Sequence, residues 1–151
     1  MFNLKSTSEP YWSAERDERV LRGRITLGDF SEEFESSLSY WAQADYEHQW
    51  LEAAGRIKAG QTKSAFIVDM YDPSKTPFIM RWPIWRRDKT ILVQNRLLLF
   101  KNLTVAFKAT NPYIHIGERA TKNDDGEAIS EWQVSLKDIQ DFYTSISATS
   151  V

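Results

Sequence analysis

Apolar and polar positions alternate along several short segments, and this period of two predicts β-strands. The first such segment is Val20–Leu27. Three more follow one another closely and predict an antiparallel meander: residues 64–71, 78–85 and 90–100. Pro83 interrupts the middle strand of this meander. Because proline has no backbone N–H, we expect an edge position or a β-bulge there.

Two other segments repeat their apolar residues at helical spacing. Asp45 is a candidate cap for a helix that runs to about Lys58, and Gly60 follows its end. Ser135 and Asp138 have the pattern that opens a C-terminal helix. This order of elements predicts a single α+β domain covering the whole chain, with helices packed on one face of a twisted antiparallel sheet.

The segments before and after the first predicted strand carry weaker patterns. Residues 1–18 are mostly polar, and we expect them to form a loosely held arm. Asp29 followed by Glu32 resembles a helix cap. This spacing predicts a short helical turn with Phe30 and Phe34 facing inward.

Composition narrows the function classes. Hydrophobic residues make up 42% and charged residues 26%, which argues against general disorder. Cysteine is absent, so disulfides, thiolate zinc sites and cysteine nucleophiles are excluded. No secretory signal or membrane-length apolar segment is present, and we expect a cytoplasmic protein. The six Trp residues exceed what a core of this size needs, so we expect one or two at the surface.

The sequence offers little for catalysis. His48 and His115 have no cysteine, nucleophile elbow or metal-ligand spacing beside them. The Asp124–Glu127 segment resembles a cation loop but lacks the alternating ligands of an EF-hand, and it fits a hairpin turn better. The glycines form no phosphate-binding pattern. We therefore expect no enzyme activity, no cofactor and no metal.

Charge is strongly segregated along the chain, although the net charge is only −2. Residues 29–60 carry seven acids and two bases, residues 81–101 six bases and one acid, and residues 118–141 seven acids and three bases. One interpretation is that these segments form solvated faces whose opposite signs attract across the fold. The other is that an acidic surface meets a basic partner and sets the rate and specificity of the encounter.

A nucleic-acid hypothesis rests on the segment Arg81–Arg87, which interleaves bases with Trp82 and Trp85. Single-strand-binding surfaces combine stacking rings and phosphate contacts in this way. Against it, the chain as a whole is slightly acidic, and the rings could instead belong to the core. Binding of a single strand through this segment is therefore the alternative function.

A series of short motifs spans about residues 38–146. In order along the chain, they are Ser39-Tyr40-Trp41, Asp45-Tyr46, Trp50-Leu51, Ser64-Ala65, Met70-Tyr71 with Pro73 and Lys75-Thr76, Phe78-Ile79, Val93-Gln94-Asn95, Asp125-Gly126, Ile129-Ser130-Glu131-Trp132 and Asp141-Phe142-Tyr143. In these motifs and their order the chain resembles the CdiI immunity proteins of contact-dependent growth inhibition systems, and among them the Enterobacter cloacae type. The chain departs from the family pattern in the basic strand, at Arg81, Pro83, Arg86 and Arg87.

The resemblance implies a cytoplasmic antitoxin that binds the C-terminal toxin domain of a CdiA protein as a 1:1 complex and is a monomer when free. In the matching type the toxin is a 16S rRNA nuclease, and the immunity protein has an α+β fold likened to Whirly domains. No membrane or nucleic acid is then expected as a partner. Our candidate toxin-binding residues lie in two places, near a hairpin predicted from residues 119–122 and 128–135 and on the outer face of the first meander strand: Asp69, Tyr71, Asp72, Glu118, Asp124, Asp125 and Glu127. Trp41, Trp50 and Trp132 are expected in the core.

Overall fold

Two antiparallel sheets and two helices make up residues 1–149, the part of the chain that the computed structural model describes. Sheet A contains β1 (Phe2–Ser6), β2 (Tyr11–Ser13), β3 (Glu18–Leu27) and β4 (Phe30–Ser37). Sheet B contains β5 (Lys63–Asp69), β6 (Phe78–Arg87), β7 (Thr90–Gln94), β8 (Arg96–Leu99) and β9 (Glu131–Ser135). The helices are α1 (Gln43–Lys58) and α2 (Leu136–Thr149), with 3-10 turns η1 (Phe100–Asn102) and η2 (Pro112–His115). The predicted α+β class with antiparallel strands is confirmed.

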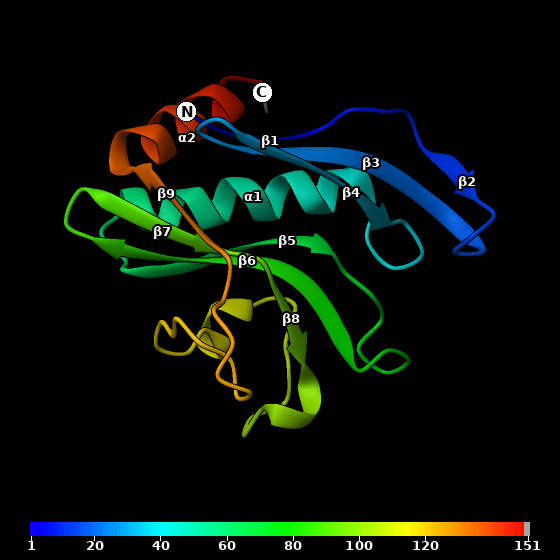
Figure 1. Ribbon diagram of the computed structural model, residues 1–151. Coiled ribbons are helices and arrows are strands. Elements are labelled where there is room, and N and C mark those ends of the chain that lie inside the picture. Colours follow the sequence, from blue (N-terminus) through cyan, green and yellow to red (C-terminus); the bar gives the residue numbers. More distant parts are fainter. Residues whose placement is uncertain (150–151) are drawn as a thin grey trace.

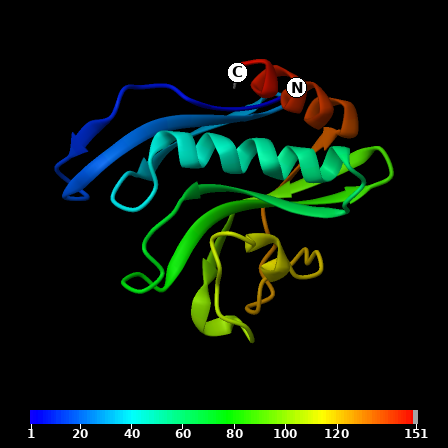
Figure 2. The same cartoon turned by 180° about the vertical axis from the view of Figure 1, so that it is seen from behind.

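The layers are plain in Figure 1 and, from behind, in Figure 2. Sheet A lies above sheet B, and α1 runs between them along one side. Both helices lie on the side of sheet B that faces sheet A. Aromatic rings from the two sheets and α2 meet in the interior. Phe2 and Phe66 lie 5.1 Å apart between ring centroids, and Phe142 packs edge-on against both.

The N-terminal segment corrects one prediction. Residues 1–18 are not a loosely held arm, because β1 pairs with β3 from Phe2↔Leu27 to Ser6↔Gly23 and β2 pairs with β3 further along. Phe2 and Leu4 point into the core, and Leu4 is only 1% exposed. Two alternating apolar side chains and a partner strand are enough to hold a segment that is otherwise polar.

The predicted helical turn after Asp29 is also wrong. Phe30–Ser37 forms strand β4, which pairs with β3 through a tight turn at Gly28, where φ is +64°. The ring of Phe34 covers Gly23 so closely that an added Cβ would lie 2.5 Å from the ring. Glycine at position 23 therefore makes room for this cross-strand contact.

Sheet B contains the predicted meander, with strand order β5-β6-β7-β9 and with β8 also paired to β6. Pro83 lies in β6, which has neighbours on both sides, so the expected edge position is wrong. The pairs Ile84↔Val93 and Arg81↔Arg96 share one register. The ladder is interrupted between these two pairs, and proline is tolerated where pairing lapses.

Side chains of helix α1 cover the edge of β5 that does not pair with another strand of sheet B. Gln49 Nε2 donates to the Ala65 carbonyl at 2.7 Å, and Gln49 Oε1 accepts from Ile67 N at 2.8 Å. Trp50 Nε1 donates to the Ile67 carbonyl at 2.8 Å. The predicted helix is confirmed, although Asp45 lies inside its first turn, where its carboxylate accepts from Ala42 N at 2.8 Å. These contacts satisfy backbone groups that an edge strand would otherwise leave unpaired.

Helix α2 begins as predicted. Ser135 Oγ accepts from Asp138 N and Asp138 Oδ2 accepts from Ser135 N, each at 3.0 Å. No helix in residues 1–149 is long and apolar enough to cross a membrane.

We call residues 96–129 the distal lobe. It begins with β8, which pairs with β6 in sheet B, and continues through both 3-10 turns to residue 129. The part after β8 lies below sheet B, on the face away from the helices (Figure 1). Three side chains of sheet B hold one of its segments by donating to backbone carbonyls: Arg81 to His115, Trp85 to Gly117 and Gln94 to Ala120, at 2.9, 3.0 and 2.9 Å.

Candidate binding surface

The predicted site residues fall into two groups that the fold keeps apart. Asp69 ends β5, and Tyr71 and Asp72 follow it, at the junction of the two sheets. The other four residues, Glu118, Asp124, Asp125 and Glu127, all lie in the distal lobe. The sequence predicted the same two groups, and the structure shows that they do not form one surface.

Asp69 is only 8% exposed and is engaged on both carboxylate oxygens. Its Oδ2 accepts from Arg16 Nη2 at 3.0 Å and from the Tyr71 hydroxyl at 2.6 Å, and its Oδ1 accepts from Ser37 N at 2.8 Å. Burial raises the pKa of Asp69, and the hydrogen bonds from Tyr71, Arg16 and Ser37 offset this only in part. These contacts join sheet A to sheet B, which gives Asp69 and Tyr71 a role in the fold.

Asp72 is half-buried and organises the turn after β5. Its Oδ1 accepts from Ser74 N at 2.9 Å and from Ser74 Oγ at 2.7 Å. These two hydrogen bonds lower the pKa of the Asp72 carboxyl. The turn predicted at residues 72–75 is therefore present and is stabilised by the aspartate itself.

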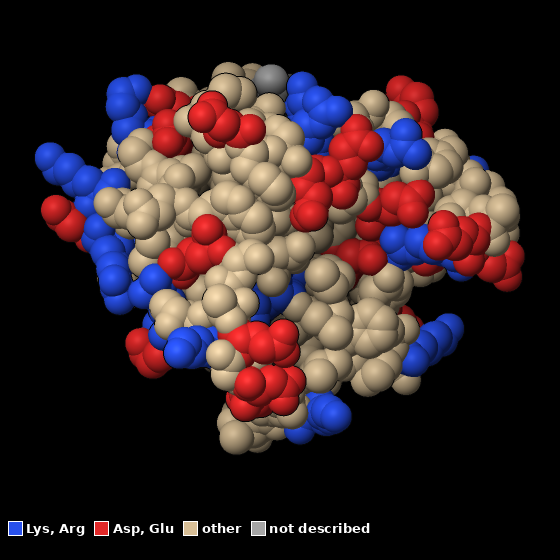
Figure 3. All heavy atoms as spheres, viewed as in Figure 1, with Lys and Arg blue, Asp and Glu red and all other residues tan. Residues whose placement is uncertain are grey.

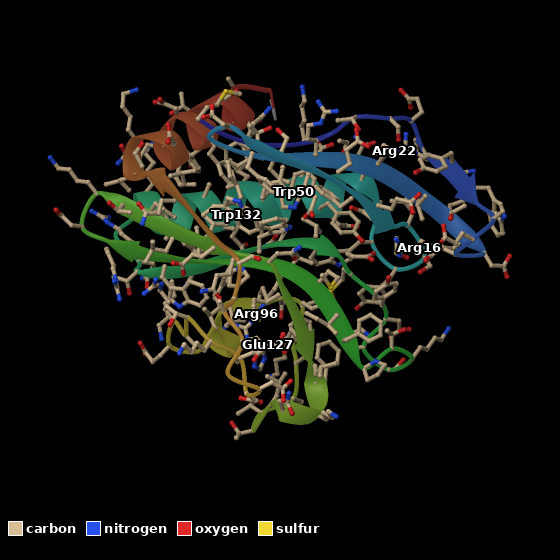
Figure 4. The ribbon with its side chains drawn as sticks, in the orientation of Figure 1. Arg16, Arg22, Trp50, Arg96, Glu127 and Trp132 are labelled. Atoms are coloured by element: carbon tan, nitrogen blue, oxygen red, sulfur yellow. The ribbon has the colours of Figure 1, made fainter. Side chains whose placement is uncertain are left out.

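The acids of the distal lobe are exposed. Asp124, Asp125 and Glu127 surround a turn in which Asn123 Oδ1 accepts from Asp125 N at 3.0 Å and from Glu127 N at 2.9 Å. Gly126 completes this turn with φ of +81°. Red side chains gather at this place at the bottom of Figure 3, where Figure 4 labels Glu127. Within residues 1–149 these three carboxylates have no cationic partner.

Glu118 differs from its three neighbours because Lys63 Nζ donates to its Oε1 at 2.7 Å. The Glu118 side chain is nevertheless 92% exposed, so this is a surface pair that contributes little to stability. Glu118 therefore remains accessible to a partner.

The lobe is anchored to β9 by a second ion pair. Arg119 Nη2 and Nε donate to the two carboxylate oxygens of Glu131 at 2.6 and 2.7 Å. This two-point geometry fixes the orientation of both side chains. The hydrogen bond from Arg119 lowers the pKa of Glu131. The Arg119–Glu131 pair therefore holds this part of the lobe against β9. No pattern in the sequence indicated the pair.

Exposed apolar side chains add to the lobe surface. Leu97, Val105 and Ile114 are each about half exposed, and all three belong to the distal lobe. Isolated apolar residues of this kind give no signal in the sequence. Trp12 is 61% exposed on β2 and confirms the expectation of a surface tryptophan, while Trp50 is buried. Trp132 is partly buried, with its ring stacked 4.6 Å from Phe30.

The structure contradicts the premise of the nucleic-acid hypothesis. Trp82 and Trp85 are 1% and 8% exposed, so neither ring can stack on a base. Alternate residues of β6 face opposite ways, so Trp82 packs against Trp132 while Arg81 and Trp85 face the distal lobe. The two rings thus belong to opposite buried faces of one strand, and Arg81 is the one buried arginine among the three in this segment.

The histidines occupy separate elements. His48 lies on the exposed side of α1. His115 lies in η2 beside Phe107, with ring centroids 5.4 Å apart. Burial, and then the charge of Arg81, lower the pKa of His115. In the described part of the chain, no cluster of three or more His, Asp or Glu residues is arranged to hold a metal ion.

Comparisons with known proteins agree with this architecture. The family model described as the CdiI N-terminal domain matches residues 36–142. The chain is 35% identical to the immunity protein CdiI of Enterobacter cloacae over 147 residues, which cover 97% of this chain and 99% of that protein. A solved structure, a CdiA-CT/CdiI toxin and immunity complex from Enterobacter cloacae, contains a chain that matches with a TM-score of 0.88 and 35% identity, covering 98% of this chain and 99% of that one. The chain therefore belongs to the CdiI family of immunity proteins.

Proposed function

We propose that this chain, acting as one domain, is a cytoplasmic immunity protein that binds the C-terminal toxin domain of a cognate CdiA protein and neutralises it without catalysing a reaction. The observation that supports this most is its likeness, over nearly the whole chain, to a chain of a toxin and immunity complex. The free protein is a monomer in this proposal and forms a 1:1 complex.

We further propose that the toxin is a nuclease, directed at 16S rRNA. A protein that cleaves RNA carries a basic surface for the phosphate backbone. The three unpaired carboxylates of the 124–127 turn are suited to such a surface. Opposite charges would steer the two proteins together before contact.

The proposed toxin-binding surface is the exposed side of the distal lobe. It combines Glu118, Asp124, Asp125 and Glu127 with nearby apolar groups, and protein interfaces use both kinds of residue. The apolar side chains would supply contact area with the toxin. The acids would raise the rate of association and make the binding specific for the cognate toxin. Asp69, Tyr71 and Asp72 lie outside this surface, and their polar groups serve the fold.

Growth of cells that express the cognate toxin domain tests the proposed function. Co-expression of this chain should restore growth, and a CdiI protein from an unrelated toxin–immunity pair should not. A toxin inactivated at its own catalytic site supplies the control for expression load. Failure of this chain to protect, although it is expressed and folded, would refute the proposal.

A further inference from the structure

Two arginines lie at one pocket of the distal lobe, between β8 and residues 117–120. Arg81 in β6 is directly opposite Arg96 in β8 in the strand register. Both line a cavity of about 210 Å³, whose walls also include Pro83, Trp85 and Leu97. Figure 4 labels Arg96 here, and Figure 3 shows recessed blue atoms at the same place, above the acids of the 124–127 turn.

Arg81 is buried without an anionic partner. It is 7% exposed, and only its Nη2 makes a hydrogen bond, to the carbonyl of His115 at 2.9 Å. Its Nε and Nη1 are buried and have no acceptor in the described part of the chain. A buried cation without a counter-charge is among the most costly arrangements in a protein interior, and an anion that enters would relieve this cost.

Arg96 does not offset the charge of Arg81. Its Nη1 donates to Gln94 Oε1 at 3.2 Å, a neutral acceptor. Burial, and then the nearby charge of Arg96, lower the pKa of Arg81 to about 10, so the side chain stays protonated at neutral pH. Glu118 also lines the pocket, but its side chain is almost fully exposed and pairs with Lys63 Nζ at 2.7 Å, so water and Lys63 offset its charge. By contrast, Arg16 and Arg119 each have a carboxylate partner.

We propose that this pocket is an oxyanion-binding site that takes a single carboxylate or a phosphate-sized group between Arg81 and Arg96. A guanidinium offers a planar fork of N–H donors that matches such groups with two hydrogen bonds. The side chains of Pro83 and Trp85 in the wall of the pocket are buried, and they lower the local polarity beside Arg81. The oxyanion comes either from an acidic side chain of the bound partner, which rests on the proposed function, or from a free small anion, which does not.

Thermal unfolding of the full chain tests the site, with inorganic phosphate and acetate as probes at constant ionic strength. A ligand that binds only the folded state raises the melting temperature in a saturable way. We expect this rise in the wild type and in Arg87→Gln, a matched control at the exposed end of the same strand. In Arg81→Gln and Arg96→Gln the apparent affinity should fall about tenfold or more, because a charged hydrogen bond is lost.

Arg96→Gln keeps the test valid if Arg81→Gln fails to fold, because within residues 1–149 the Arg96 side chain makes a single hydrogen bond, to Gln94. A wild type without a saturable rise overturns the proposal. So does an equal rise in wild type, Arg81→Gln and Arg96→Gln, because the anion then binds elsewhere.

A second measurement separates the two sources of the anion. Saturating phosphate should weaken binding of a catalytically inactive toxin domain to wild type and to Arg87→Gln, but not to Arg96→Gln, if a toxin carboxylate occupies the pocket. Unchanged toxin affinity in phosphate assigns the pocket to a free anion. Absence of toxin binding by every variant would refute the proposed function and leave the phosphate result standing.

Discussion

Arg16 Nη2 lies 3.0 Å from Asp69 Oδ2, and this contact joins the β2–β3 turn of sheet A to the end of β5 in sheet B. Arg16 Nη2 also donates to the Tyr71 hydroxyl at 2.7 Å, and that hydroxyl donates onward to Asp69 Oδ2. Both charged side chains are largely buried. The network therefore connects the two sheets in the interior. The sequence had instead suggested Asp69 and Tyr71 as surface residues that bind the toxin.

Asp69→Ala should destabilise the fold strongly. The substitution leaves the buried Ser37 N without its acceptor, and it removes one of the two carboxylates that pair with Arg16, which keeps Glu18. An unsatisfied buried donor alone costs about 1–3 kcal/mol, and the loss of an ion-pair partner adds to this. Denaturant unfolding measures the loss, and Asp124→Ala at the exposed turn should stay within about 0.5 kcal/mol of wild type. Equal stability of Asp69→Ala and Asp124→Ala would mean that Asp69 is not a junction residue.

Leu4→Ala tests the corrected view of the N-terminus. Leu4 is fully buried beneath the β1–β3 pairing, and a Leu→Ala cavity costs about 2–5 kcal/mol. Its neighbour Lys5 is exposed, so Lys5→Ala should change the free energy of unfolding little. A loosely held arm would instead tolerate both substitutions equally.

Glu131→Gln should lose stability in a pH-dependent way. The folded pKa of Glu131 lies below its ordinary value of 4.5, mainly because Arg119 donates to the carboxylate. The stabilisation is therefore fully present above about pH 4.5 and is lost as pH falls through the lower folded pKa. Unfolding free energies at stepwise pH from 7 to 3 should show the gap between wild type and Glu131→Gln closing. Glu127→Gln, at an exposed acid of the same lobe, serves as the control, and a gap independent of pH would contradict the assignment.

Charge reversal of the distal turn, Asp124→Lys with Asp125→Lys, should slow toxin association. At low salt we expect a drop of about tenfold, because steering by opposite charges is lost. Glu9→Lys with Glu15→Lys makes the same change in net charge at exposed residues of the loops between β1, β2 and β3, and it should leave the rate closer to wild type. At about 1 M salt, where screening acts within about 3 Å, the variants should converge. Equal association rates at low salt would remove this turn from the surface.

Local patterns account for the part of the fold that the sequence predicted. Helix α1 and the meander were found because their periodicity is carried by neighbouring residues. Phe30 and Phe34 show the limit of this reasoning. A spacing of four places two residues on one face of a helix and equally on one face of a strand. Pairing with β3 decides between them, and that partner is visible only in three dimensions.

In the candidate site, too, contacts between residues far apart in the sequence could not be predicted. Asp69 looks like a surface acid because its partner Arg16 is 53 residues away in the chain. Trp82 and Trp85 look like stacking platforms because their sequence neighbours are basic, whereas the strand turns the two rings to opposite buried faces. The turn at residues 124–127 was predicted correctly, because residues that favour turns lie next to each other in the sequence there. Asn123 accepts from the backbone of the turn, and Gly126 adopts its positive φ.

Isothermal titration of the full chain with the catalytically inactive toxin domain of its cognate CdiA protein tests the central claim most directly. We predict saturable binding with one toxin domain per chain. A toxin domain from an unrelated CdiA protein should give no binding heat under the same conditions. Absence of binding to the cognate domain by correctly folded protein, at concentrations where both partners are soluble, would contradict the account.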